Sequence, residues 1–328
     1  MDTFLIPIEG LRLEQRFDVG PVILHAVDDV PLRARSILGA SMDHPLLAEE
    51  DGRKRLFEWS AAGFECDSVE TAIRVVRDAL DLLRVFGWSI AMVRPTSFGL
   101  SGDVPSGQFL YLQSGDRAGV GWRRTGHALG HGLSDHARDL WSNSPFARLA
   151  ALVSSEPTSS GHARSMLAVH TLSRATLDDR PDLRMLTTVI AIEAALGGGG
   201  KAYELARRAA FFTCGPPTDP QCGRGQNACR FLTTNPRERG SVDLLKRYEK
   251  DARSDPAKRC SEWLDFLDRY SDRSSIAHGD PAFLPDAGDA DQDLYWALHH
   301  LLAPALAWLL DHSDDPIGQL DSEIDSIA

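Results

Sequence analysis

The stretch Tyr270-Ser271-Asp272-Arg273-Ser274-Ser275-Ile276-Ala277-His278-Gly279-Asp280 decides how the second half of this chain is interpreted. It closes a run from Cys260 to Ala277 in which apolar side chains recur at offsets of three and four, as on one face of an amphipathic helix. Gly279, followed by Pro281, is typical of a helix end, so we expect His278 in the last turn. The negative end of the helix dipole favours a protonated imidazole there.

The spacing of Arg273 and His278 limits what they can do within one chain. Five residues on an ideal helix subtend about 500°, so the two side chains point roughly 140° apart. Either the last turn unwinds, or a second copy of the motif completes a shared site. In the alternative, which gives the motif no catalytic role, Arg273 pairs with a carboxylate and His278 simply ends a helix.

Two earlier stretches accompany this motif. Leu186–Leu196 carries Glu193 in an otherwise apolar run, and Leu205–Phe212 carries Arg208 followed by alanines. Together with the Tyr-x2-Arg-Ser-x3-His-Gly motif, and in this order, they resemble the Apea-like branch of the HEPN superfamily. The resemblance covers roughly residues 165–312, and a Cys- and Pro-rich insertion, Cys214–Cys229, departs from the family pattern.

The resemblance implies a fold, an assembly and an activity. It implies an antiparallel helical bundle whose homodimer brings two Arg-x4-His motifs together and cleaves RNA without a metal. Arg273 and His278 would be catalytic, with Ser274 and Tyr270 of the same motif in supporting roles. It also implies a toxin or phage-defence setting, with an antitoxin or a phage-derived trigger as a further partner and the N-terminal domain as sensor or substrate selector.

The chemistry of the two residues agrees with such an activity. Cleavage of RNA without a metal needs a base for the 2′-hydroxyl, an acid for the leaving 5′-oxygen and a cation on the phosphate. His278 titrates near neutrality and can serve as base or acid. The Arg273 guanidinium stays charged and offers a planar fork to two phosphate oxygens. One copy supplies one histidine, whereas a dimer through the 260–311 helices supplies two.

Glu193 and Arg208 form a second pair of interest. A carboxylate on an apolar face costs several kcal/mol unless it is paired. Arg208 and Arg273 are both possible partners. We favour a Glu193–Arg208 clasp between helices, which would hold Arg273 in place, over direct catalysis by Glu193.

Composition and charge bound the remaining choices. The chain has 328 residues, 43% of them hydrophobic, which suits one large domain or two ordinary ones. The net charge is −12, yet residues 201–260 carry 13 Lys/Arg against 7 Asp/Glu, and residues 261–328 carry 2 against 15. The basic segment is compatible with RNA binding, and equally with pairing to the acidic segment.

The first part of the chain predicts a mixture of strands and helices. Asp67-x-x-Glu70 resembles a capping box that opens a helix ending at Phe86, with Gly87 as its stop. Short alternating runs bounded by Gly, Asp and Pro predict strands at 4–8, 22–26, 55–59, 89–93, 108–113 and 121–124.

The pattern turns helical after residue 134. The Ser/Pro/Gly-rich stretch Ser154–Gly161 predicts a domain boundary. We therefore expect an α+β N-terminal domain over 1–155, an all-α HEPN-like antiparallel helical bundle over 162–312, and an acidic C-terminal tail over 313–328. The expected helices are 135–153, 162–177, 181–196, 201–213, 241–253, 260–278 and 291–311.

We expect no metal and no other cofactor. His127, His131 and His136 lie among glycines that disfavour a regular helix, and Cys214–Cys229, even with Cys260, lacks paired Cys-x2–4-Cys spacing. Five cysteines without an export signal predict reduced thiols in a cytoplasmic protein, and no stretch suggests a membrane span. The rival functions are a non-catalytic HEPN module that binds RNA, nucleotide or a protein, and a bundle that only dimerises the N-terminal domain.

Overall fold

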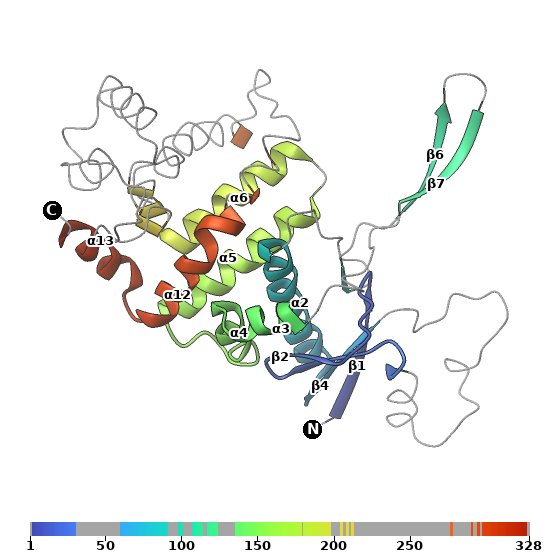
Figure 1. Cartoon of the computed structure of the whole chain (residues 1–328), viewed down its shortest axis with the longest axis horizontal. Coiled ribbons are helices and arrows are strands. Elements are labelled where there is room, and N and C mark those ends of the chain that lie inside the picture. Colours follow the sequence, from blue (N-terminus) through green and yellow to red (C-terminus); the bar gives the residue numbers. More distant parts are fainter. Residues whose placement is uncertain are drawn as a thin grey trace. The chain divides into compact units, whose positions relative to one another are not determined.

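The computed structural model divides the chain into two compact units, Met1–Glu156 and Pro157–Ala328. The division falls inside the Ser/Pro/Gly-rich stretch 154–161. An antiparallel sheet with helices forms the first unit, and the described part of the second unit is helical (Figure 1). The structure describes residues 2–30, 60–90, 98–100, 107–113, 117–123, 135–178, 180–197, 204–205, 208–209, 211–212, 276–277, 290, 294–295 and 297–326.

The sheet of the first unit has five antiparallel strands in the order β2-β3-β4-β1-β5. The long central pairing joins β1 to β4, from Asp2 opposite Cys66 to Pro7 opposite Ala61. A separate hairpin joins β6 to β7. The strands are β1 (Asp2–Glu9), β2 (Phe17–Val19), β3 (Val22–His25), β4 (Ala61–Cys66), β5 (Gly99–Leu100), β6 (Gly107–Gln113) and β7 (Arg117–Arg123).

Helix α2 (Val69–Ile90) lies against the sheet and, among the described elements of the first unit, supplies the largest number of buried apolar residues. Its side chains Leu80, Leu83 and Phe86 are almost completely buried. The Phe86 ring makes edge-on contacts with Trp141 at 5.0 Å and with Phe146 at 5.8 Å. These contacts join α2 to the two short helices α3 (Asp135–Ser142) and α4 (Pro145–Ala150).

Both predicted ends of the α2 segment were wrong. The amide of Thr71 donates to Ser68 Oγ at 3.1 Å, so the cap is Ser68 and not Asp67. The helix continues through Gly87 to Ile90, which excludes the first two residues of the predicted strand 89–93. A glycine costs only about 1 kcal/mol inside a helix, and burial of the preceding Val85 and Phe86 outweighs that cost.

Other predicted elements were shifted, divided or missed. The helix predicted over 135–153 is two helices, because Ser144 caps α4 by accepting the amide of Ala147 at 3.3 Å. Strand β4 follows the predicted strand 55–59, which lies outside the described residues. The short strands β2 and β5 had no clear alternating pattern, and the sequence analysis missed them.

The second unit is built on the pair α5 (Ser160–Leu177) and α6 (Pro181–Leu196) (Figure 1). Arg164, near the start of α5, donates to the carbonyl of Ala194, near the end of α6, so the two helices are antiparallel. Ser159 caps α5 by accepting the amide of His162 at 3.2 Å. Pro181 opens α6, which suits the first turn because proline lacks an amide hydrogen.

Helix α12 (Ala303–Asp311) packs against both α5 and α6. It is preceded by a π-helical segment, η4 (Ala297–Leu302), where the sequence predicted an unbroken helix. Pro304 lies just after this segment, and its missing amide hydrogen removes one bond of the regular ladder. At the other end of α12, Gly161 approaches so closely that a Cβ there would lie 2.0 Å from the carbonyl oxygen of Leu309.

The C-terminal segment that we expected only as an acidic tail contains helix α13 (Pro316–Ser326). Asp315 caps it by accepting the amide of Gly318 at 3.1 Å, and Leu320 and Ile324 are buried. Glu323 and Asp325 are exposed on this amphipathic helix, whereas Asp321 is partly buried. Within the described part of the chain, no helix is long and apolar enough to cross a membrane.

Candidate functional site

Helix α6 and the helical residues that follow it carry two of the six candidate site residues. Glu193 lies in the last turn of α6 and is partly exposed. Arg208 lies among helical residues between Glu204 and Phe212, and only 8% of it is exposed. Arg273, His278, Ser274 and Tyr270 lie outside the described residues. Ile276 and Ala277, which directly precede His278 in the sequence, are helical.

The Arg208 guanidinium donates hydrogen bonds from all three of its nitrogens, and Glu193 is not among the acceptors. Its Nε and Nη2 donate to the two carboxylate oxygens of Asp321 at 2.8 and 2.6 Å. Its Nη1 donates to the carbonyls of Leu196 at 3.0 Å and Gly197 at 3.2 Å. The favoured Glu193–Arg208 clasp was therefore wrong, because the carboxylate that pairs with Arg208 comes from α13.

We call this arrangement the Arg208 clasp, comprising Arg208, Asp321 and the carbonyls of Leu196 and Gly197. The last carbonyls of a helix have no partner within the helix, and a cation near them is favoured by the helix dipole. Gly197 has a φ of 86°, as is common just after a helix. A Cβ at Gly197 would lie 3.1 Å from Arg208 Nη1, so the missing side chain leaves room for the guanidinium.

An aromatic cluster next to the clasp joins the same elements. Phe211 and Phe212 make edge-on contacts with Trp308 of α12 at 5.8 and 6.3 Å. The ring of His312 stacks on Trp308 at a centroid distance of 3.8 Å. Trp308 Nε1 donates to the carbonyl of Pro316, the first residue of α13, at 2.9 Å. These contacts give Arg208 a fixed position and a structural role.

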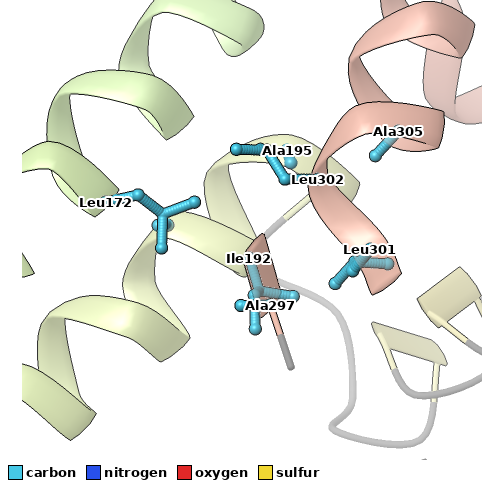
Figure 2. A pocket seen from close by; sticks show the side chains of 8 residues that line it. Leu172, Ile192, Ala195, Ala297, Leu301, Leu302 and Ala305 are labelled. Atoms are coloured by element: carbon cyan, nitrogen blue, oxygen red, sulfur yellow. The ribbon is translucent and has the colours of Figure 1, made fainter. Parts of the chain in front are cut away.

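A pocket among the described helices of the second unit contains no group that could carry chemistry. It lies between α5, α6 and the η4–α12 segment, and its empty volume is about 200 Å³, part of which is open to solvent (Figure 2). Every side chain that lines it is apolar: Leu172, Ala191, Ile192, Ala195, Ala297, Leu301, Leu302 and Ala305. Such a lining provides neither a nucleophile nor a proton-transfer group, so the pocket is a packing defect of the helical core.

His162 is the one buried histidine among the residues whose side chains the structure describes. It is 4% exposed in the first turn of α5, and burial lowers the pKa of its imidazole. The positive end of the helix dipole also disfavours a charged imidazole at this position. His162 is therefore a neutral core residue, and the sequence analysis did not single it out.

No metal site is found in the part of the chain that the structure describes, where no three His, Cys, Asp or Glu side chains gather closely enough to hold an ion. The histidines at 127 and 131 and the cysteines at 214, 222, 229 and 260 lie outside that part, as does the side chain of His136. The predictions about them stay predictions.

Comparisons with protein-family models, with curated proteins and with solved structures find no match for this chain. The residues of the chain and the geometry just described are therefore the basis for assigning a function.

Proposed function

We propose that this protein is a metal-independent endoribonuclease of HEPN type. In this proposal Arg273 and His278 from two chains form one composite site in a cytoplasmic homodimer. The observation that carries the proposal is the order of three patterns in one helical unit. The pattern around Glu193 lies on α6 and the pattern around Arg208 lies on helical residues, and both precede the Arg273-x4-His278 motif.

The structure of the second unit supports the proposal in two respects. The antiparallel pair α5 and α6, packed against α12, is the kind of scaffold that an antiparallel helical bundle requires. The Arg208 clasp holds Arg208 to the end of α6 and to α13, which assigns this arginine to the scaffold. The chemistry is then left to Arg273 and His278, with Ser274, Tyr270 and Glu193 in supporting roles.

In this mechanism, one His278 accepts the proton of the 2′-hydroxyl, and the partner's His278 protonates the leaving 5′-oxygen. The Arg273 guanidinium binds the phosphate as negative charge develops on it. The 2′-oxygen forms a bond to phosphorus as the bond to the 5′-oxygen breaks, which leaves a 2′,3′-cyclic phosphate. A toxin or phage-defence setting, with an antitoxin or a phage-derived trigger, would control when this site acts.

The test incubates a panel of RNAs with the full-length protein in EDTA. We expect cleavage to persist without divalent ions, to spare DNA and 2′-O-methyl RNA, and to fall by more than about 100-fold in His278→Ala and in Arg273→Ala. Arg273→Lys should recover little activity, because an ammonium group lacks the bidentate fork. Arg174→Ala, which removes an exposed arginine of α5, is the matched control and should retain activity.

Three results would contradict the proposal. Equal cleavage by the wild type and His278→Ala would show that a different group or a contaminant cuts the RNA. A strictly monomeric protein at micromolar concentration in light scattering would rule out the composite site. Intact RNA that binds the wild type and binds less tightly to both variants would indicate a non-catalytic binding module.

A further inference from the structure

Strand β1 is paired along one side and, among the described strands, only at the end of its other side. On the first side, β4 pairs with residues 2–7 of β1. On the second side, β5 pairs with Ile8 and Glu9. No described strand pairs with residues 2–7 on that second side. We call this side of residues 2–7 the free edge of β1.

The backbone groups that point to the free edge belong to Thr3, Leu5 and Pro7. In an antiparallel ladder, alternate residues direct both their N–H and their C=O groups to the same neighbouring strand. The amide of Ile8 donates to the carbonyl of Ser60, just before β4, at 3.0 Å, so the even-numbered residues of β1 face β4. Pro7 agrees with this assignment, because a proline has no amide hydrogen and its nitrogen suits the unpaired side of an edge strand. Thr3 and Leu5 therefore each offer an amide and a carbonyl to a further strand.

The buried face of the sheet continues as far as the free edge. Ile6 lies opposite Ala62 of β4, which lies opposite Leu24 of β3, so the three belong to one face. Ala62 and Leu24 are completely buried, whereas Ile6 is partly exposed. Phe4 belongs to the same face and is also partly exposed, although its neighbour Phe64 on β4 is buried. The apolar face of the sheet thus ends at β1 with apolar side chains that are only partly covered.

The free edge lacks the features that commonly protect edge strands from pairing. Native edge strands are often very short, or carry lysine or proline along the edge. The segment Thr3-Phe4-Leu5-Ile6 has no charged residue and no proline, and Pro7 comes only at its end. An edge of this kind binds a further extended strand through backbone hydrogen bonds.

The free edge is complementary to itself in one register. A two-fold axis places β1 antiparallel to β1 of a second copy, and each edge-facing residue then pairs with another edge-facing residue. An axis at Leu5 would put Asp2 of the second copy opposite Ile8, which β5 already pairs with. An axis at Phe4 pairs Thr3 with Leu5 of the second copy and stops short of β5.

We propose that the free edge of β1 binds the free edge of a second copy of this chain, antiparallel and with the two-fold axis at Phe4. Thr3 exchanges backbone hydrogen bonds with Leu5 of the second copy, and Leu5 does the same with Thr3 of the second copy. The two Phe4 residues face each other at a non-hydrogen-bonded position, where Cα atoms are about 4.5 Å apart and aromatic pairs stabilise a sheet. This interface lies in the first unit and needs neither Arg273 nor His278, so it goes beyond the proposed function.

Disulfide trapping in the full-length protein tests the register. Phe4→Cys puts a thiol on the axis, and Cα atoms about 4.5 Å apart suit a disulfide. With copper phenanthroline as the oxidant, we expect a covalent dimer on a non-reducing gel and in the intact mass. Leu5→Cys is the matched control, because residue 5 lies opposite residue 3 of the second copy and not opposite itself. It should link about tenfold more slowly or less, and the wild type with its own five cysteines gives the background.

Leu5→Pro, introduced beside Phe4→Cys, tests the backbone hydrogen bonds. The amide of Leu5 points to the free edge and not to β4, so the proline removes an edge donor and keeps the pairing of β1 with β4. Each copy loses one donor, and two net hydrogen bonds correspond to about a tenfold or greater loss of linking. Leu5→Ala keeps the amide and should link at nearly the parental rate. Should Leu5→Pro not fold, as judged by its unfolding transition, the comparison of Phe4→Cys with Leu5→Cys decides the question.

Hydrogen exchange of the wild type identifies what covers the edge. The amides of Thr3 and Leu5 should exchange more slowly as the protein concentration rises, because a second copy then covers them. Protection that does not depend on concentration would show that another segment of the same chain lies on the edge, and would overturn the proposal. So would slower exchange only in the presence of an added extended peptide, equal linking of Phe4→Cys and Leu5→Cys, or no linking of a folded Phe4→Cys protein.

The failure of this proposal can be told apart from the failure of the proposed function. Linking through Phe4→Cys in a protein that cleaves no RNA would leave the β1 interface in place and remove the nuclease. RNA cleavage by a protein whose Phe4→Cys variant folds and does not link would do the reverse.

Discussion

Arg84 of the first unit and Arg208 of the second are both buried and both bind backbone carbonyls, and they differ in how far along the chain they reach. Arg84 of α2 is 3% exposed. Its Nη1 donates to the Asp81 carboxylate at 2.8 Å, and its Nε donates to the carbonyl of Phe98 at 2.9 Å. Its guanidinium also lies 5.3 Å from the centre of the Phe98 ring. All of these contacts span fewer than two dozen residues, so Arg84 fixes a local segment against α2.

Arg208 makes the same kinds of bonds, but its carboxylate comes from a distant part of the sequence. Its carboxylate partner, Asp321, is 113 residues away and is 40% exposed. Arg208 therefore holds the C-terminal helix α13 to the end of α6. A buried arginine can therefore stabilise either a local segment or the packing of distant helices, depending on how far along the sequence its carboxylate partner lies.

The largest expected effect is that of Arg84→Ala. The change leaves the Asp81 carboxylate and the Phe98 carbonyl without their buried cation, and breaking a buried pair costs about 3–5 kcal/mol. Hydrogen exchange of the α2 amides, with urea denaturation of the full chain, measures the loss. Arg74→Ala is the matched control on the same helix, because Arg74 is 50% exposed and its pair with Asp78 contributes about 1 kcal/mol or less.

A smaller effect is expected for Asp321→Ala. Arg208 then keeps its two carbonyl partners but loses its carboxylate, and partial exposure of Asp321 reduces the cost to about 1–3 kcal/mol. Faster hydrogen exchange should appear in α13 and at the end of α6. Glu323→Ala removes the same charge from an exposed position of α13 and should change neither. Equal effects of the two substitutions would show that the Arg208 clasp does not hold α13 to the end of α6.

The smallest effect concerns His162, a base that avoids a buried charge by staying neutral. Burial lowers the pKa of the folded His162 below its ordinary value of about 6.5. Between the folded and the unfolded pKa, the unfolded chain binds more protons than the folded chain. The stability that the neutral imidazole contributes is therefore complete above about pH 6.5 and is lost as the pH falls through the folded pKa. Urea denaturation at several pH values should show this slope, and His162→Gln should flatten it. A slope that is identical in the variant would assign the pH dependence to other groups.

Much of the second unit could be predicted because its signals are local. The bounds predicted for α6, 181–196, were correct, since Pro181 starts the helix and glycines follow Leu196. The α+β character of the first unit was also correct in outline. Gly87 was wrongly predicted to end α2, because a glycine ends a helix only where packing does not continue past it.

The sequence by itself determined which residues can pair, and only the tertiary structure decided which of them do. Glu193 is 15 residues from Arg208 and has the right charge, yet Asp321 takes that role, because α13 folds back onto the end of α6. Residue type and helical period are properties of short segments, whereas an ion pair depends on the direction in which two segments approach each other. The same reason applies to the β6–β7 hairpin, where alternation is visible in the sequence but the pairing of Phe109 with Gly121 and of Tyr111 with Gly119 is known only from the register of the strands.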